Sequence, residues 1–236
     1  MSAGPELWRQ GEEGERLAEL LAVESTFWAR GLRHIAGVDE AGRGPLAGPV
    51  LAAAVIMPPG EAIPLVNDSK RLSRAVREKL AAEILRRAVS VGIGAASVRE
   101  VDRLNILRAT HLAMCRAVRR LQVAPEHILV DGLPVPALGP GHTAVVEGDR
   151  RVHSVACASI VAKVTRDRLM RRLAARYPGY GWERNAGYDT REHREALARL
   201  GPTPHHRRSF GPVQLHLELG EGVLGDSGRG KDRRHA

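Results

Sequence analysis

The feature that most constrains the fold of this chain is a pair of short apolar runs joined by a glycine-rich connection. The runs are Ile35–Val38 and Val50–Ile56, and they predict two buried strands of one sheet. The connection begins with Asp39-Glu40 and continues as Ala41-Gly42-Arg43-Gly44-Pro45. Acidic residues at the end of a buried strand are unusual, because carboxylates are seldom buried without a partner. We therefore expect a rigid sheet that ends in a functional loop.

The same arrangement of apolar strand, acid and glycine recurs twice. Ile128-Leu-Val130 leads into Asp131-Gly132, and Val145-Val146 leads into Glu147-Gly148-Asp149. A solvated loop is the ordinary interpretation of one such acid, but three strand ends of this kind favour a shared site for Mg²⁺ or Mn²⁺. Successive side chains of a strand point to opposite faces, so Asp39 and Glu40 would share that site only if the backbone turns there.

Periodicity of apolar residues predicts the remaining elements. Helices are expected over residues 12–29, 73–89, 99–121, 154–175 and 190–200, with a strand near 91–94. Strands followed by alternating helices and strands predict an α/β fold, a mixed β-sheet flanked by helices with a helical C-terminal extension. We divide the chain into a helical lead-in at 1–34, one catalytic domain at 35–219, and a disordered tail at 220–236 that has almost no apolar residues.

Composition favours a polyanionic partner. The chain has 36 basic and 27 acidic residues, a formal net charge of +9, and only 3% aromatic residues. These values indicate nucleic acid, bound through the backbone of a duplex rather than by stacking of unpaired bases. No apolar run approaches the roughly 18 residues of a membrane span, and no secretory signal is present. We expect a cytoplasmic monomer with no membrane contact, and Cys115 and Cys157 as core residues of a reducing compartment.

The predicted helix over residues 154–175 carries polar residues on one face. Ser159, Lys163 and Asp167 recur every four residues within otherwise apolar sequence, so their side chains lie on the same side of the helix. An amphipathic surface helix with an ion pair between Lys163 and Asp167 would give this pattern. The alternative is a helix that lines the carboxylate site.

These residues lie in sequence blocks that closely resemble those of the ribonuclease HII family. The blocks follow the family order from Ile35 to Val213, and the first is highly specific. They comprise residues 37–50, 68–70, 131–132, 148–149, 158–167, 187–188 with 190–193, and 206–210.

The resemblance implies a ribonuclease H-like fold and an endoribonuclease. Such an enzyme hydrolyses the RNA strand of RNA–DNA hybrids and incises 5′ of ribonucleotides embedded in duplex DNA. Two divalent ions, Mn²⁺ or Mg²⁺, would clamp the scissile phosphate about 3.5–4 Å apart and leave 5′-phosphate and 3′-hydroxyl ends. The implied catalytic and metal-binding residues are Asp39, which would bridge both ions, Glu40, Asp131 and Asp149.

The resemblance also implies a set of residues that bind the substrate. Glycines allow the backbone to approach a sugar closely, and the 2′-hydroxyl is the group that separates RNA from DNA. Tyr188 would stack beneath the sugar on the DNA side of a junction. The implied substrate-binding residues are Gly42, Arg43, Gly44, Lys70, Ser159, Lys163 and Tyr188.

One position departs from the family pattern. Glu147 stands where a lysine usually precedes the Gly-Asp of the fourth carboxylate block, so it adds negative charge beside the expected metal site. Asp167 is a candidate auxiliary acid.

Three other functions remain as alternatives. A junction resolvase could use similar carboxylates, but the Gly42-Arg43-Gly44 turn and Tyr188 argue against it. A non-catalytic duplex-binding protein would gain nothing from acids near phosphate. A phosphate-loop NTPase is disfavoured because residues 42–48 lack the terminal Gly-Lys-Ser/Thr.

Overall fold

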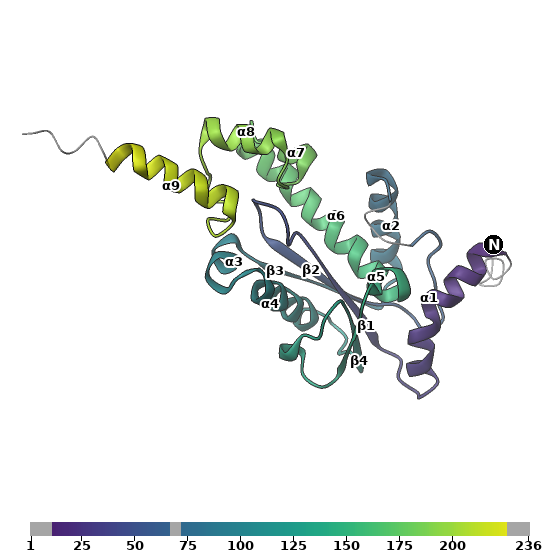
Figure 1. Cartoon of the computed structure of the whole chain (residues 1–236). Helices are drawn as coiled ribbons and strands as arrows, with labels where there is room; N and C mark the ends of the chain where they lie inside the picture. Colours follow the sequence, from purple (N-terminus) through teal and green to yellow (C-terminus); the bar gives the residue numbers. More distant parts are fainter. Residues whose placement is uncertain (1–10, 67–71, 226–236) are drawn as a thin grey trace, which may run out of the picture.

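The computed structural model describes residues 11–66 and 72–225, which form three layers (Figure 1). A five-stranded sheet is the middle layer, and helices cover both of its faces. The strands are β1 (Ile35–Ala41), β2 (Val50–Ile56), β3 (Ser90–Ala96), β4 (His127–Asp131) and β5 (His142–Val145). The helices are α1 (Glu12–Trp28), α2 (Arg74–Arg87), α3 (Val98–Leu104), α4 (Ile106–Arg119), α5 (Gly148–Arg151), α6 (His153–Arg176), α7 (Trp182–Asn185), α8 (Arg191–Leu200) and α9 (Gly211–Gly225), with a 3₁₀ turn at Pro136–Leu138.

The order of the strands brings two acidic strand ends together. The order is β3-β2-β1-β4-β5, in which β2 runs antiparallel to β1 and β3, whereas β1, β4 and β5 are parallel. Val38 of β1 lies opposite Val130 of β4, so Asp39 and Asp131 follow side by side. The sheet is therefore mixed, as predicted, and its centre carries carboxylates at the ends of two neighbouring strands.

Each face of the sheet packs against its own hydrophobic cluster. Val38 and Val130 pack with α3 and α4 on one face. Ala53 and Val55 pack with α2 and α6 on the other, where Figure 1 shows the long α6 lying across the sheet. Helix α1 contributes Phe27 and other residues to a further cluster, beside β4 and β5. Successive side chains of a strand alternate between the two faces of the sheet. The packing contacts therefore determine which face each strand residue occupies, including the acidic residues at the strand ends.

Glycines allow the helices to approach the sheet at backbone distance. A Cβ atom at Gly37 of β1 would lie 2.1 Å from the carbonyl carbon of Ser154 in α6. On the opposite face, a Cβ atom at Gly94 of β3 would lie 2.0 Å from the carbonyl oxygen of Ala113 in α4. Real Cβ atoms do not approach the backbone so closely. The position of α6 over the sheet therefore requires a residue without a side chain at position 37.

Most of the predicted elements are present, but the helix expected over residues 99–121 is divided into α3 and α4. Asn105 between them has φ of 68°, and its side chain accepts a hydrogen bond from the backbone N–H of Arg108. Asparagine tolerates this left-handed conformation and caps the next helix.

The predicted disordered tail, residues 220–236, overlaps a helix at its beginning. Helix α9 continues to Gly225, so the range 220–236 predicted as a tail begins within a helix, and its remainder lies outside the described residues. Both cysteines are free and buried, as predicted. In the part of the chain that is described, no helix is long and apolar enough to cross a membrane.

We predict that Gly37→Ala lowers the free energy of unfolding by about 3 kcal/mol, because the added methyl group forces α6 away from β1. The matched control is Gly141→Ala, where a Cβ atom would meet nothing within 4 Å. Urea unfolding of the two variants and the wild type measures the difference. Equal stability of the two variants would show that the α6–β1 contact tolerates a side chain.

Candidate active site

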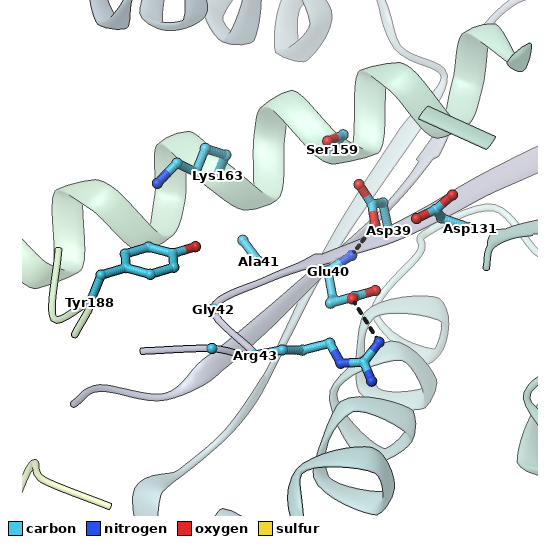
Figure 2. A pocket seen from close by; sticks show the side chains of 10 residues that line it. Asp39, Glu40, Ala41, Gly42, Arg43, Asp131, Ser159, Lys163 and Tyr188 are labelled. Atoms are coloured by element: carbon cyan, nitrogen blue, oxygen red, sulfur yellow. Dashed lines mark hydrogen bonds and ion pairs between the residues drawn. The ribbon is translucent and has the colours of Figure 1, made fainter. Parts of the chain in front are cut away.

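A cleft of about 350 Å³ opens where β1 ends, beside α6 (Figure 2). It brings together residues that are far apart in the sequence. Most of the residues implied by the family resemblance line it. The lining residues are Asp39, Glu40, Ala41, Gly42, Arg43, Gly44, Asp131, Ser159, Lys163 and Tyr188.

The carboxylates reach the cleft from two faces of the sheet. Asp39 shares the face of β1 that carries Ala41, which packs with α6, and Asp131 lies next to it. The Glu40 side chain lies on the opposite face of β1 from Asp39. Together with His111 of α4, it lines a small neighbouring pocket. The sequence suggested that these two side chains could share a site only if the backbone turned at Asp39-Glu40. The strand continues to Ala41, and the side chains reach one cleft because it lies at the strand end.

Burial and mutual repulsion oppose the charged forms of these acids. Desolvation, followed by the charges of Glu40 and Asp131, raises the pKa of Asp39 well above its usual value, although a hydrogen bond with the Ser159 side chain opposes the shift. Desolvation also raises the pKa of Glu40, against the effect of Arg43, whose Nη1 lies 3.6 Å from Glu40 Oε1. The protein therefore holds negative charge in the cleft at a cost in stability.

The donors in the cleft suit a hard divalent cation. Asp39, Glu40 and Asp131 offer carboxylate oxygens, the ligands that Mg²⁺ and Mn²⁺ prefer, and a cation would relieve their repulsion. Among the described residues, no three acidic, histidine or cysteine side chains converge tightly enough to hold an ion alone. An ion held by one or two of these carboxylates would complete its coordination with water or phosphate oxygens.

Two buried arginines hold the glycine-rich loop by its backbone carbonyl groups. Arg207 donates to the carbonyl oxygens of Gly42 (2.6 Å), Arg43 (2.8 Å) and Gly48 (2.8 and 3.0 Å). Arg166 of α6 donates to the carbonyl oxygens of Pro49, Ala47 and Ala186, the last of which lies in the loop before Tyr188: the three distances are 3.1, 3.0 and 2.9 Å. Burial lowers the pKa of Arg207 to about 9.

Packing against Arg166 explains the glycine at Gly42. Gly42 has φ of 96°, and a Cβ atom there would lie 2.0 Å from Arg166 Nε. At Gly44 the same atom would meet only the Tyr188 ring, at 3.8 Å. The first glycine of the turn is thus required by the fold, whereas the second leaves open space facing Tyr188.

Tyr188 is held by its own backbone and by the loop before it. Its carbonyl oxygen lies 2.9 Å from His193 Nδ1, and Gly187 accepts a hydrogen bond from Leu46 N at 2.8 Å. The ring centroid lies 5.6 Å from Lys163 Nζ, and 40% of the residue is exposed. A rigid backbone therefore presents an accessible ring at the edge of the cleft (Figure 2).

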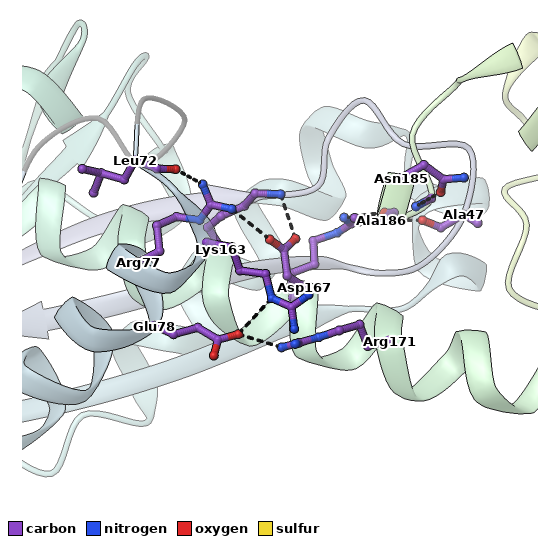
Figure 3. Close-up of polar contacts among 12 residues, drawn as sticks. Ala47, Leu72, Arg77, Glu78, Lys163, Asp167, Arg171, Asn185 and Ala186 are labelled. Atoms are coloured by element: carbon purple, nitrogen blue, oxygen red, sulfur yellow. Dashed lines mark hydrogen bonds and ion pairs between the residues drawn. The ribbon is translucent and has the colours of Figure 1, made fainter. Parts of the chain in front are cut away.

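Among the described residues, two of those proposed from the sequence do not line the cleft. Asp149 lies buried in α5, one position after Gly148, whose N–H donates to Asp131 Oδ1 at 2.7 Å. Asp167 lies further along α6, where it accepts a hydrogen bond from Lys163 Nζ at 2.7 Å (Figure 3). Lys70 lies outside the described residues.

Glu147, the departure from the family pattern, points away from the acids. Its backbone is left-handed, with φ of 56°, and its side chain is 63% exposed and pairs with Arg150 at 3.3 Å. The additional negative charge is therefore balanced at the surface.

Sequence analysis gave no role to Arg166 or Arg207, although each lies within a family block. The sequence contained one clue for each arginine. Arg166 is a basic residue within a largely apolar predicted helix, and Arg207 lies next to His206 in the last family block. Neither signal identifies the carbonyl groups that the arginine binds. Those of Ala47, Gly48 and Pro49 lie more than a hundred residues away in the sequence, and that of Ala186 lies 20 residues away.

Comparison with known proteins agrees with this geometry. Residues 36–213 match the family described as Ribonuclease HII. The chain belongs to the ribonuclease HII family. The ribonuclease HII of Ruegeria pomeroyi is 58% identical over 196 residues, which cover 83% of this chain and 83% of that protein.

Solved structures share the fold. The ribonuclease H2 of Pyrococcus horikoshii has a TM-score of 0.66 and 26% identity, and the match covers 79% of this chain and 98% of that one. Bst-RNase HIII in complex with Mn²⁺ has a TM-score of 0.60 over 94% of this chain and 78% of its own, and at 18% identity it shows the fold alone. The predicted ribonuclease H-like fold is confirmed.

Family membership decides between the functions that the sequence left open. The enzyme is a ribonuclease H, an endonuclease that hydrolyses RNA in RNA–DNA hybrids. A non-catalytic duplex-binding protein and a phosphate-loop NTPase are thereby excluded.

We predict that Asp39→Asn stabilises the protein near neutral pH when divalent ions are chelated. The fold raises the pKa of Asp39 above its usual 3.8, so the unfolded chain releases this proton at a lower pH than the native state. Stability is then lost as the pH rises above about 4, and the neutral amide avoids this loss, so the variant should melt at a higher temperature than the wild type at pH 8. Thermal unfolding in EDTA from pH 4 to 8 measures this difference.

The difference between wild type and Asp39→Asn should shrink as the pH falls towards 4. Added Mn²⁺ should raise the melting temperature of the wild type more than that of the variant. A variant that is less stable than the wild type at pH 8 in EDTA would contradict the electrostatic account.

Proposed function

We propose that this enzyme incises duplex DNA 5′ of embedded ribonucleotides as well as cutting long hybrids, and leaves 5′-phosphate and 3′-hydroxyl ends. The observation that carries the proposal is that the Gly42-Arg43-Gly44 turn and Tyr188 lie together in the cleft that holds the acids (Figure 2). One wall can then bind a ribose while a neighbouring ring contacts the next sugar.

The glycine turn supports recognition of a single 2′-hydroxyl. The Gly42 and Arg43 carbonyl groups are held by Arg207, so the backbone does not need to be ordered when substrate binds. Gly44 has no side chain to keep a sugar away from that backbone. We propose that backbone groups of this turn hydrogen-bond to the 2′-hydroxyl of the ribonucleotide at the cut.

Tyr188 supports recognition of the junction. A Cβ atom at Gly44 would lie 3.8 Å from the Tyr188 ring, so the bare glycine leaves a gap between the turn and the ring. In our proposal the ring contacts the sugar that follows the ribose. A ring packed against a deoxyribose leaves no room for an added 2′-hydroxyl. Tyr188 would therefore favour DNA immediately 3′ of the ribonucleotide.

Asp39, Glu40, Asp131 and Asp149 are the residues that we propose to hold two divalent ions. When bound, Mg²⁺ or Mn²⁺ would activate water and stabilise the charge that develops on the leaving 3′ oxygen. Asp39 lies beside both Glu40 and Asp131, which suits a ligand shared by two ions. The ribonuclease HIII structure that contains Mn²⁺ has the same fold, which supports the choice of ion class.

The helix α6 supports the same site through its polar face. Ser159 contacts Asp39, and Lys163 lines the cleft one turn further along. We propose that Ser159, Lys163 and Lys70 contact phosphate. Asp167 serves by orienting Lys163 rather than as an acid of the metal site, because its carboxylate binds Lys163 Nζ.

We predict that Asp39→Asn and Asp131→Asn each abolish cleavage of a duplex with one embedded ribonucleotide, because each removes a charged ligand at almost constant volume. The control is Glu195→Gln, an equal charge change in an exposed pair with Arg191, which should leave the rate unchanged. Gel analysis of the products with Mg²⁺ or Mn²⁺, against EDTA, measures activity. Full turnover in EDTA would refute the metal mechanism.

We predict that Tyr188→Ala slows incision at a single ribonucleotide by roughly tenfold to a hundredfold, because an aromatic contact is worth about 1–3 kcal/mol. Tyr188→Phe keeps the ring and should retain most of the rate. Single-turnover rates on the junction substrate and on a long hybrid, with circular dichroism to check folding, make the comparison. Equal rates of Tyr188→Ala and wild type on both substrates would remove Tyr188 from recognition.

A further inference from the structure

A second cleft, of about 400 Å³, adjoins the active-site cleft. Lys163 and Tyr188 belong to the walls of both. The second cleft is bounded by α2, α6 and α7, and we call it the arginine groove. Its basic lining residues are Arg74, Arg77, Lys163, Arg171 and Arg184.

We propose that the arginine groove binds backbone phosphates of the cleaved strand on the 3′ side of the ribonucleotide. The proposal rests on the function proposed above, which puts the scissile phosphate at the acids, the ribose at the glycine turn and the next sugar at Tyr188. A strand that follows this order reaches the groove directly after Tyr188, because Tyr188 borders both clefts.

The groove has more cations than carboxylates around it. Its lining holds five cations and two carboxylates, Asp167 and Glu183. Arg184 pairs with Glu183 and also with Glu192, which lies outside the lining. Glu78, beside the groove, is shared between Arg74 Nε at 3.2 Å and Arg171 Nη2 at 3.0 Å, so one carboxylate serves two guanidinium groups. A polyanion entering the groove would therefore gain more attraction than repulsion.

The cations are held in place before substrate binds (Figure 3). Asp167 accepts a hydrogen bond from Lys163 at 2.7 Å and lies 3.7 Å from Arg77 Nη2. Arg77 Nη1 donates to the carbonyl oxygen of Leu72 at 2.5 Å, and the Arg77 side chain is only 13% exposed. Cations that are ordered in advance lose little entropy on binding, and a guanidinium fork matches a phosphate.

The polar face of α6 gives the groove its direction. Lys163, Asp167 and Arg171 follow one another at four-residue intervals, so the face that begins at Ser159 in the active-site cleft continues into the groove. At about 1.5 Å of rise per residue, Lys163 and Arg171 are roughly 12 Å apart along the helix. A duplex strand presents about three or four phosphates over that length.

The lining favours phosphate over a base or a small apolar ligand. Trp182 is buried, and Tyr188 faces the active-site cleft, so the groove offers no pair of exposed rings between which a base could stack. Contacts of guanidinium groups with phosphates position a strand without reading its sequence. The groove should therefore act on any sequence.

Replacing single phosphates tests the proposal. A duplex with one ribonucleotide is prepared with an uncharged methylphosphonate at each of the first four positions 3′ of the ribonucleotide, one at a time. We expect Arg171→Ala to lower kcat/KM on the natural duplex by about tenfold and to leave kcat at saturation unchanged. The substitution removes a charged hydrogen bond that is made equally in the enzyme–substrate complex and in the transition state. The slope of log kcat/KM against log salt should fall by about 0.9.

The decisive result is a double-mutant cycle. On the methylphosphonate duplex that removes the contacted phosphate, Arg171→Ala should cost nothing further. Arg172→Ala is the matched control, because Arg172 is exposed on the same helix but outside the groove lining. Arg74→Ala, at a side chain 55% exposed, provides a second variant whose folding is not at risk.

Two results would overturn the proposal. One is that Arg171→Ala and Arg74→Ala match Arg172→Ala on the natural duplex. The other is that their losses persist on every methylphosphonate duplex. Failure of the proposed function is distinct, because wild type would then not incise the ribonucleotide duplex at all. The groove would in that case be tested by fluorescence anisotropy, where the same variants should weaken binding of that duplex without added divalent ions.

Discussion

The structure depends on two buried guanidinium groups that bind backbone carbonyl oxygens. Arg166 and Arg207 are both fully buried, and between them they hold the loop from Gly42 to Pro49, while Arg166 also holds the loop that leads to Tyr188. Burying a guanidinium is costly unless its N–H groups find acceptors, and here the chain supplies carbonyl oxygens from two distant loops. The two arginines thereby fix the position of the glycine-rich turn relative to Tyr188.

Unlike the two arginines, whose burial is offset by hydrogen bonds to carbonyl groups, the acidic residues of the cleft are buried at a cost in stability. Asp39 lies in a buried position where desolvation and the charges of Glu40 and Asp131 disfavour its ionised form. The fold tolerates this because β1 and β4 are fixed by packing on both faces, with Gly37 allowing α6 to lie against the sheet. If Asp39 holds a divalent ion, as proposed above, the stability lost at this buried carboxylate would become affinity for metal.

Helix α6 connects recognition to chemistry along one face. Ser159 contacts Asp39, Lys163 borders both clefts, and Arg171 lies in the arginine groove. Asp167 and Glu78 do not add to the acid site, and instead they orient the cations around them. In the binding mode proposed above, this one helix would align the scissile phosphate with phosphates further along the strand.

The sequence by itself determined the α/β class, the strands that end in acid and glycine, and the family, because hydrophobic periodicity and short motifs are local properties of a chain. It singled out Asp39, Glu40 and Asp131, which line one cleft, but it merged α3 with α4. Only the tertiary structure decided that Asp39 lies beside Asp131, that Arg207 holds Gly42, and that Tyr188 lines the same cleft as Gly44. These contacts join residues far apart in the chain, and strand register and helix packing set them, so no local pattern could have specified them.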